Sequence, residues 1–278
     1  MSCALASESV QLASDFPAFS EHKPFTITLL ASLSNGELNL REIFYQLPIT
    51  ETNFRAKEGK KVKIDVLGHT GAIIAAKCKF DGTLKVRGID KGTRAFNNCI
   101  SMVITVSSGD GRPAKNIDFK MFKDNIQTTG NKNLAQTEEA WGYLKSYLLE
   151  MKNVATVPVA SMELTKLRYK MVDITFDLGF KISREKLKSA IDKVNGFHVI
   201  WESGVHSNGV SVKYPLEKFD GEMVKSKKMP RCVSMIVFTT GKVICSGESP
   251  EIMEPVYNLF HRTIGTLRNE IELRIKNR

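Results

Sequence analysis

Lysine and arginine side chains offer the clearest chemistry in this sequence, because they recur at strand-like spacing. The chain has 278 residues, with 40 Lys and Arg against 30 Asp and Glu, for a formal net charge of +10. The stretch 55–94 contains eleven basic and four acidic residues, and so holds +7 of that charge. Its runs Lys77–Phe80 and Leu84–Arg87 alternate basic and apolar residues, which predicts strands with one buried and one basic face. Such a face either binds the phosphates of a polyanion or keeps an exposed strand edge soluble.

A second basic cluster lies at 225–231, directly before the apolar run 232–239, which is predicted to be a strand. Lys228 and Arg231 belong to this cluster. The same two interpretations apply to it.

The motifs of common enzymes are missing from the sequence. The five cysteines are not spaced as zinc ligands, Gly241-Lys242-Val243 lacks the rest of a phosphate-binding loop, and there is no His-Glu-x-x-His. Asp173 and Asp177 are the one pair of carboxylates that a strand could bring together. We therefore expect neither an enzyme nor a bound cofactor or metal. With 42% hydrophobic residues but only short apolar runs and no signal peptide, we expect an intracellular protein outside the membrane.

The elements that must position the basic residues occur twice. Four segments of the first half resemble four of the second in the same order: 38–43 with 182–187, 69–74 with 206–210, 100–104 with 233–237, and 125–130 with 242–247. Each half is predicted to contain a strand, a helix, several antiparallel strands and a long helix. We assign 24–152 to the first repeat and 153–278 to an ordered connector and the second repeat. Residues 1–23 are predicted to be a loose arm.

The two long helices are expected over 136–151 and 250–274. Apolar residues recur there at spacings of three and four, which predicts one face packed on a sheet. Ser249 is a suitable N-cap, Pro250 suits the first helical position, and Pro255 is expected to kink the early turns.

The second repeat resembles the TATA-box-binding protein family. The resemblance rests on Met235–Gly247, an apolar run ending in Phe, then Thr-Gly-Lys, then an apolar run ending in Ser-Gly. Thr175–Ile182 is similar to the family's first strand and its turn into a helix. The first repeat matches more loosely, through 38–43 and 126–130. Its divergence, its long loops and the run 96–100 look most like the TATA-binding-like proteins of large cytoplasmic DNA viruses.

This resemblance implies an α+β fold, a saddle of two pseudo-repeats whose curved antiparallel sheet carries helices on its convex face. In that family the concave face lies in the minor groove of A·T-rich DNA, where apolar wedges open base steps. The resemblance thus implies a DNA-binding transcription initiation factor that binds double-stranded DNA and recruits RNA polymerase and initiation factors. It would act in the nucleus, or in a viral factory or virion.

The DNA-binding residues carried over from the family lie mostly in the second repeat. Phe238 matches a wedge, although its spacing alone favours a buried strand phenylalanine, and Lys242 matches a phosphate-binding lysine. The remaining predicted residues fall into four groups. They are groove-facing or neighbouring strand positions (Val243, Cys245 and Ser246), nearby basic residues (Lys213, Arg231 and Lys228), the counterpart of the motif in the first repeat (Gln127 and Thr129), and the basic strands of the first repeat (Lys77, Lys79, Lys85 and Arg87).

The sequence departs from the family at other wedge positions. Thr105 or Val106 stands where the first repeat should carry a Phe, and the partner wedges fall near Thr70 and Ser207. The family's two groove asparagines correspond to about Ile27 and Met171. We therefore expect weak or less specific DNA binding. The alternative function is a saddle-fold scaffold that binds proteins in a transcription complex. An accessory domain of a nucleic-acid-processing enzyme is disfavoured, because the two repeats use nearly the whole chain.

Overall fold

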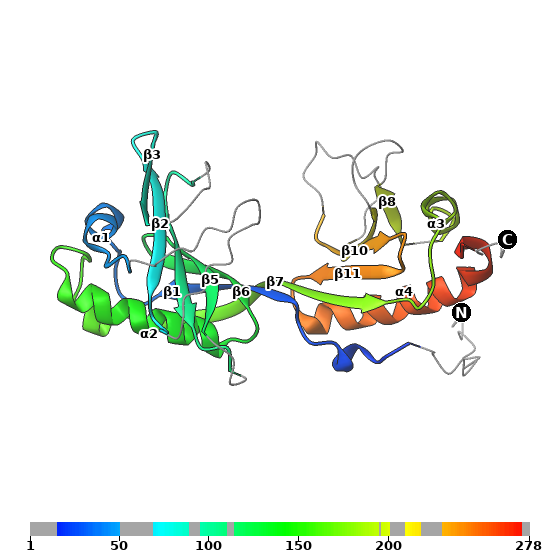
Figure 1. Ribbon diagram of the computed structural model, residues 1–278, viewed down its shortest axis with the longest axis horizontal. Coiled ribbons are helices and arrows are strands. Elements are labelled where there is room, and N and C mark those ends of the chain that lie inside the picture. Colours follow the sequence, from blue (N-terminus) through cyan, green and yellow to red (C-terminus); the bar gives the residue numbers. More distant parts are fainter. Residues whose placement is uncertain are drawn as a thin grey trace, which may run out of the picture. The chain divides into compact units, whose positions relative to one another are not determined.

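The computed structural model describes residues 16–50, 69–88, 95–109, 114–194, 196–200, 209–217 and 230–273. The chain divides into two compact units. The N-terminal unit is Pro24–Val172, and the C-terminal unit combines Met1–Lys23 with Asp173–Arg278. Each unit is described by itself below (Figure 1).

The N-terminal unit is a meander of antiparallel strands with two α-helices. Its strands are hydrogen-bonded in the order β3-β2-β4-β5-β6-β1, followed by the first part of β7. The elements are β1 (Thr26–Leu33), α1 (Leu40–Gln46), β2 (Ile73–Phe80), β3 (Thr83–Gly88), β4 (Ile100–Val106), β5 (Lys115–Met121), β6 (Asn125–Asn131), α2 (Ala135–Glu150), η2 (Val159–Ser161) and β7 (Leu164–Asp177).

The C-terminal unit has a similar plan. The second part of β7 is followed in the sheet by β11, β10, β9 and β8. The elements are η1 (Phe19–Glu21), α3 (Arg184–Ile191), β8 (His198–Ile200), β9 (Gly209–Pro215), β10 (Cys232–Phe238), β11 (Lys242–Gly247) and α4 (Pro250–Ile271). Over the described residues this makes one eleven-stranded sheet and four α-helices, so the predicted α+β class with an antiparallel sheet is confirmed.

The core of the N-terminal unit lies between one face of its sheet and both helices. Alternate strand residues such as Ile104 and Phe119 are fully buried against Ile43 of α1 and Leu144 of α2. Helix α2 packs on β4 and β6, and α1 packs on β2 (Figure 1). Each such buried side chain stabilises the fold by about 1.5–3 kcal/mol, so the period-two pattern decides which face the helices cover.

Helix α4 covers the sheet of the C-terminal unit. Its residues Met253, Phe260 and Ile264 are fully buried at helical spacing. Ser249 is the N-cap and Pro250 the first residue, as predicted. The helix continues through Pro255 to Ile271, although a proline at this position lacks the N–H that would donate to the Glu251 carbonyl.

The order of the strands in the sheet contradicts two of the four segment equivalences that the sequence predicts between the halves. Counted from β1 and from β7, the equivalent strands are β6 with β11, β5 with β10, and β4 with β9. The predicted pairing of 100–104 with 233–237 therefore joins β4 to β10, whereas the counterpart of β4 is β9. The predicted pairing of 69–74 with 206–210 is displaced in the same way, because it leads to the start of β9 instead of β8. These pairings were wrong because any strand with one buried face shows the same apolar alternation. The stretch between Val106 and Asn125, which lies between the paired segments 100–104 and 125–130, contains β5.

The described part of the N-terminal arm is packed, not loose. Residues 1–15 lie outside the described residues. The ring of Phe16 lies 4.4 Å from the ring of His261 on α4, and Phe19 and His22 pack on Tyr257. The Tyr257 hydroxyl donates to the Pro17 carbonyl at 2.8 Å and lies 2.7 Å from His22 Nε2.

His261 sits inside this aromatic cluster as a buried base. Only 5% of it is exposed, and neither ring nitrogen has a hydrogen-bond partner within the described part of the chain. Burial, with a smaller contribution from the charge of His22, lowers the pKa of His261 from 6.5 to about 4. A neutral imidazole is thus built into the contact between the arm and α4.

We predict that acid weakens the fold through His261. Because the folded-state pKa is lowered, the stabilisation is complete above pH 6.5 and is lost as pH falls toward about 4. The free energy of unfolding, measured with urea at several pH values, should fall by about 2–3 kcal/mol from this group over that range. His261→Phe should remove this part of the pH dependence, and His69→Gln, an exposed histidine in the other unit, should keep it. Equal pH profiles for His261→Phe and the wild type would contradict the assignment.

Candidate nucleic-acid interface

In each unit, one face of the sheet points away from the helices and is called the outer face below. This face carries the residues suited to nucleic acid. In the N-terminal unit the strand register aligns one row across it: Lys77 of β2 pairs with Ser101 of β4, Ser101 with Lys120 of β5, and Lys120 with Gln127 of β6. Leu30 of β1 pairs with Gln127 at the end of the row. Neighbouring strands lie about 4.8 Å apart, so the two lysines stand about 10 Å from each other with a hydroxyl between them.

The predicted alternation holds for β2. Lys77 and Lys79 lie on the outer face, while Cys78 between them is fully buried. Burial raises the pKa of the Cys78 thiol to about 11, so it remains a protonated core residue. The strand therefore has the predicted buried and basic faces.

Lys85 and Arg87 of β3 lie on the opposite face. They pair with Cys78 and Ala76, whose side chains point toward the helices. Lys85 Nζ contacts the hydroxyl of Tyr45 on α1 and lies 5.0 Å from the centre of its ring. Arg87 Nη1 donates to the Phe44 carbonyl at 2.5 Å.

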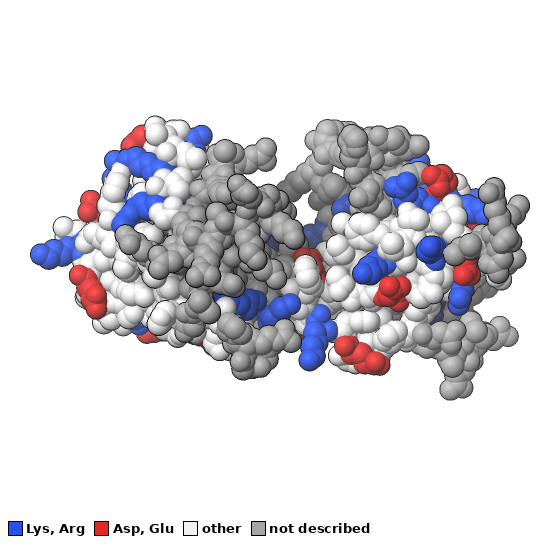
Figure 2. Space-filling model, viewed as in Figure 1, with Lys and Arg blue, Asp and Glu red and all other residues white. Residues whose placement is uncertain are grey.

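The four basic residues of β2 and β3 thus do not form one surface, because the register of the hairpin reverses the phase on β3. The outward positions of β3 are taken by Leu84 and Val86, of which Val86 is 40% exposed. Figure 2 shows Lys and Arg side chains gathered over α1 and the β2–β3 hairpin.

Sequence reasoning missed Lys120 and Phe96. Lys120 lies on the outer face beside Gln127, and its Nζ stands 4.9 Å from the centre of the Phe96 ring, which is 55% exposed. The signal was the alternation of apolar and polar residues from Ile117 to Met121, a stretch to which the four paired segments assign no element. Gln127 and Thr129 do lie on the outer face of β6, as their predicted role requires, and Thr129 Oγ1 is 3.2 Å from Thr28 Oγ1.

The outer face of the C-terminal unit is formed by hydroxyl and apolar residues with a few lysines. Lys213 of β9 pairs with Ser234 of β10, which pairs with Ser246 of β11, and Lys213 Nζ donates to Ser234 Oγ at 3.3 Å. Ile236 is 37% exposed, and Phe238 is half-buried beside it. Gly209 leaves room for both, since a Cβ there would meet Ile236 at 2.7 Å and Phe238 at 3.4 Å.

Val243 and Cys245 were placed on the wrong side. They pair with Val237 and Met235, are fully buried and face α4. Burial raises the pKa of Cys245 to about 12. Because side chains alternate along β11, only Ser246 of the three predicted residues, together with Ile244, faces outward.

The basic side chains of the C-terminal unit differ in whether carboxylates already bind them. Lys242 is exposed directly after Gly241, which must be glycine because its φ is +91° and a Cβ there would lie 2.2 Å from the Phe180 carbonyl oxygen. Arg231 is held by Glu248 through bonds of 2.8 and 2.5 Å and lies 4.0 Å from Glu217. A phosphate would have to compete with these carboxylates. Lys228 lies outside the described residues.

The N-terminal unit carries a second phenylalanine equivalent to Phe238. Met121 pairs with Ile126 before the β5–β6 turn as Val237 pairs with Val243 before the β10–β11 turn. The next residue is Phe122 in the first turn and Phe238 in the second. Phe122 is half-buried, and its N–H donates to the Asn125 carbonyl at 2.8 Å.

Thr105, the expected counterpart of Phe238, lies on β4 instead. It is fully buried and donates to the His69 carbonyl at 2.6 Å, so it is a structural residue. The expectation that the first repeat has no phenylalanine at the position equivalent to Phe238 was therefore wrong, because it followed the misplaced strand pairing.

The remaining positions compared with the family serve other purposes. Thr70 accepts a hydrogen bond from the Tyr143 hydroxyl at 2.8 Å, Ile27 is buried on the helix side, and Met171 is 38% exposed. Ser207 lies outside the described residues. Within the described ranges no three His, Cys, Asp or Glu side chains gather as metal ligands, and no helix could cross a membrane.

Comparison with known proteins gave matches among solved structures alone. No family model and no curated protein matches the sequence. Fifteen solved chains match, among them the one titled "Methanococcus jannaschii TBP", with 15% identity and a TM-score of 0.44 over 90% of this chain and 99% of that one. The resemblance to viral proteins receives no support from these matches. At so low an identity and TM-score, the similarity carries no conclusion about what this chain binds.

Proposed function

We propose that this chain binds duplex DNA through the outer faces of its two units and acts in transcription initiation. The observation that carries the proposal is the repeated arrangement of Phe122 and Phe238 at equivalent turns, each beside an outer face of hydroxyl, amide and lysine side chains. Binding in the minor groove, a preference for A·T-rich sites and recruitment of RNA polymerase are parts of this proposal that rest on the sequence resemblance.

The lysines would supply affinity without sequence selection. Lys77 and Lys120 flank Ser101 in one row, and each can neutralise a backbone phosphate. Ser101 and Gln127 between and beside them offer hydrogen bonds to base edges, which is the part of a contact that carries sequence information.

The phenylalanines would act on base stacking. An apolar side chain inserted between base steps unstacks them and bends the duplex, at a cost that flexible pyrimidine–purine steps such as TA keep small. Phe122 directly follows β5 and Phe238 is the last residue of β10, so both lie where a strand enters a turn, a position from which a ring can enter a groove.

The charge distribution supports modest affinity. In the C-terminal unit Arg231 is paired with carboxylates and Lys213 donates to Ser234, so a phosphate would have to compete with these partners. A protein with few phosphate contacts binds more weakly and depends less steeply on salt.

The row of lysines makes a first prediction for DNA binding. In Lys77→Gln/Lys120→Gln, the slope of log affinity against log salt, measured by fluorescence anisotropy with a 20-base-pair duplex, should become less steep by about 2. Lys85→Gln is the matched control, since Lys85 lies on the same sheet but faces α1. If the control lost as much affinity as the double variant, the outer face would not be the binding surface.

The phenylalanines make a second prediction. Phe122→Ala/Phe238→Ala should lower affinity by roughly tenfold to a hundredfold, because stacking on aromatic rings contributes about 1–3 kcal/mol per base. Bending, measured by energy transfer between dyes on the duplex ends, should fall with it, and the difference between A·T-rich and G·C-rich duplexes should shrink. Phe25→Ala, which removes a 60% exposed ring, should change neither. Unchanged DNA binding in all variants, together with lost association with RNA polymerase, would favour the scaffold function instead.

A further inference from the structure

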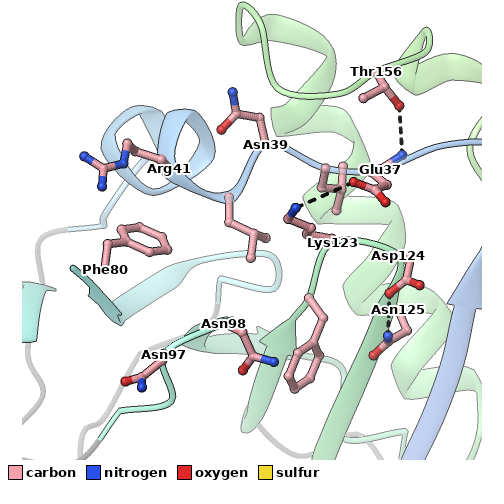
Figure 3. Close-up of a pocket in the computed structure, with 13 residues that line it drawn as sticks. Glu37, Asn39, Arg41, Phe80, Asn97, Asn98, Lys123, Asp124, Asn125 and Thr156 are labelled. Carbon is pink, nitrogen blue, oxygen red and sulfur yellow. Dashed lines mark hydrogen bonds and ion pairs between the residues drawn. The ribbon is translucent and has the colours of Figure 1, made fainter. Parts of the chain in front are cut away.

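A pocket of about 670 Å³ lies at the end of the N-terminal unit where α1 begins. It is bounded by the start of α1, the end of β2, the residues before β4 and the β5–β6 turn (Figure 3). Its volume falls in the range of small-molecule sites and suits a nucleobase with its sugar.

Flat groups line part of this pocket. The half-buried rings of Phe80 and Phe122 belong to its wall, and Arg41 Cζ stands 5.7 Å from the centre of the Phe80 ring. Aromatic rings and guanidinium planes are the groups on which unstacked bases pack.

Two exposed side-chain amides at the pocket have no hydrogen-bond partner among the described residues. Asn97 and Asn98 make none with any other residue that the structure describes, and Figure 3 shows them adjacent along one side. Asn39 and Asn125, by contrast, are engaged: Asn39 Oδ1 accepts from the Glu42 N–H at 3.4 Å, and Asn125 donates to Asp124 at 2.6 Å. Each unpartnered amide offers a donor and an acceptor, which complements the adjacent donor and acceptor on the edge of adenine.

The charges of the pocket are already balanced. Arg41 is paired with Asp81, and Lys123 Nζ lies 3.8 Å from Glu37 Oε2. Asp124 adds a further negative charge to the wall. An anionic ligand such as free phosphate would thus find no uncommitted cation among the lining residues.

We propose that this pocket binds one uncharged nucleobase, adenine by preference, between its aromatic and amide groups. The base can belong to a free nucleoside or to an unpaired nucleotide of a bound strand. The second source rests on the proposed DNA-binding function, and the first does not. An unpaired base enters such a pocket at lower cost than a paired one, since it has already lost its partner.

The test uses the fluorescence of 2-aminopurine riboside, which is quenched on stacking, with the full chain. Wild-type protein should quench it, and adenosine should compete while inorganic phosphate should not. Asn97→Ala/Asn98→Ala should weaken binding roughly tenfold or more, because the base would lose its hydrogen bonds to both amides. Asn116→Ala, an exposed asparagine of β5 outside the pocket, should bind as the wild type does. No quenching at millimolar protein, competition by phosphate, or equal binding by the double variant would overturn the proposal.

A second arm distinguishes the two sources and separates this proposal from DNA binding itself. A duplex with one extrahelical 2-aminopurine is compared with a fully paired duplex of the same sequence. If a strand supplies the base, only the extrahelical probe should be quenched, and Asn97→Ala/Asn98→Ala should abolish quenching while affinity for the paired duplex stays the same. Quenching by the riboside alone would assign the pocket to a free nucleoside. If the lysine variants lose no duplex affinity but the riboside still binds, the proposed function fails and the pocket stands.

Discussion

Burial of one face of each antiparallel strand against a helix is the constraint on which the rest of this structure depends. In the N-terminal unit, Ile104 and Phe119 lie under α1 and α2, and in the C-terminal unit Val243 and Cys245 lie under α4. Since side chains alternate, every residue between buried ones must point to the other face. The outer faces, and the lysines and hydroxyls on them, are consequences of core packing.

The same constraint explains why basic residues of one hairpin serve different purposes. On β2 the lysines fall between buried residues and face outward, whereas on β3 the register places Lys85 and Arg87 against α1. There they pack on Tyr45 and Phe44 and tie the helix to an edge strand. A count of charge along the sequence cannot distinguish these two roles, because the count carries no information on how one strand pairs with the next.

The turns after β5 and β10 occupy equivalent positions in the two units. Each holds a phenylalanine directly after a buried strand residue, and each leads into a strand with a hydroxyl-bearing outer face. The turn of the C-terminal unit requires Gly241, because a Cβ at this position would lie 2.2 Å from the Phe180 carbonyl oxygen. The turn of the N-terminal unit is one residue shorter and uses Asp124 and Asn125 instead.

The sequence alone determined the α+β class, the two similar halves, the ends of the long helices within a few residues and the outward position of Lys77 and Lys79. These follow from local periodicity and capping, which are properties of neighbouring residues. Only the tertiary structure decided that β4 is not the counterpart of β10, that Phe122 is the counterpart of Phe238, and that residues 16–23 pack on α4. Strand order, register and the packing of His261 depend on contacts between residues far apart in the chain, and similar apolar alternation in every strand leaves those contacts undetermined.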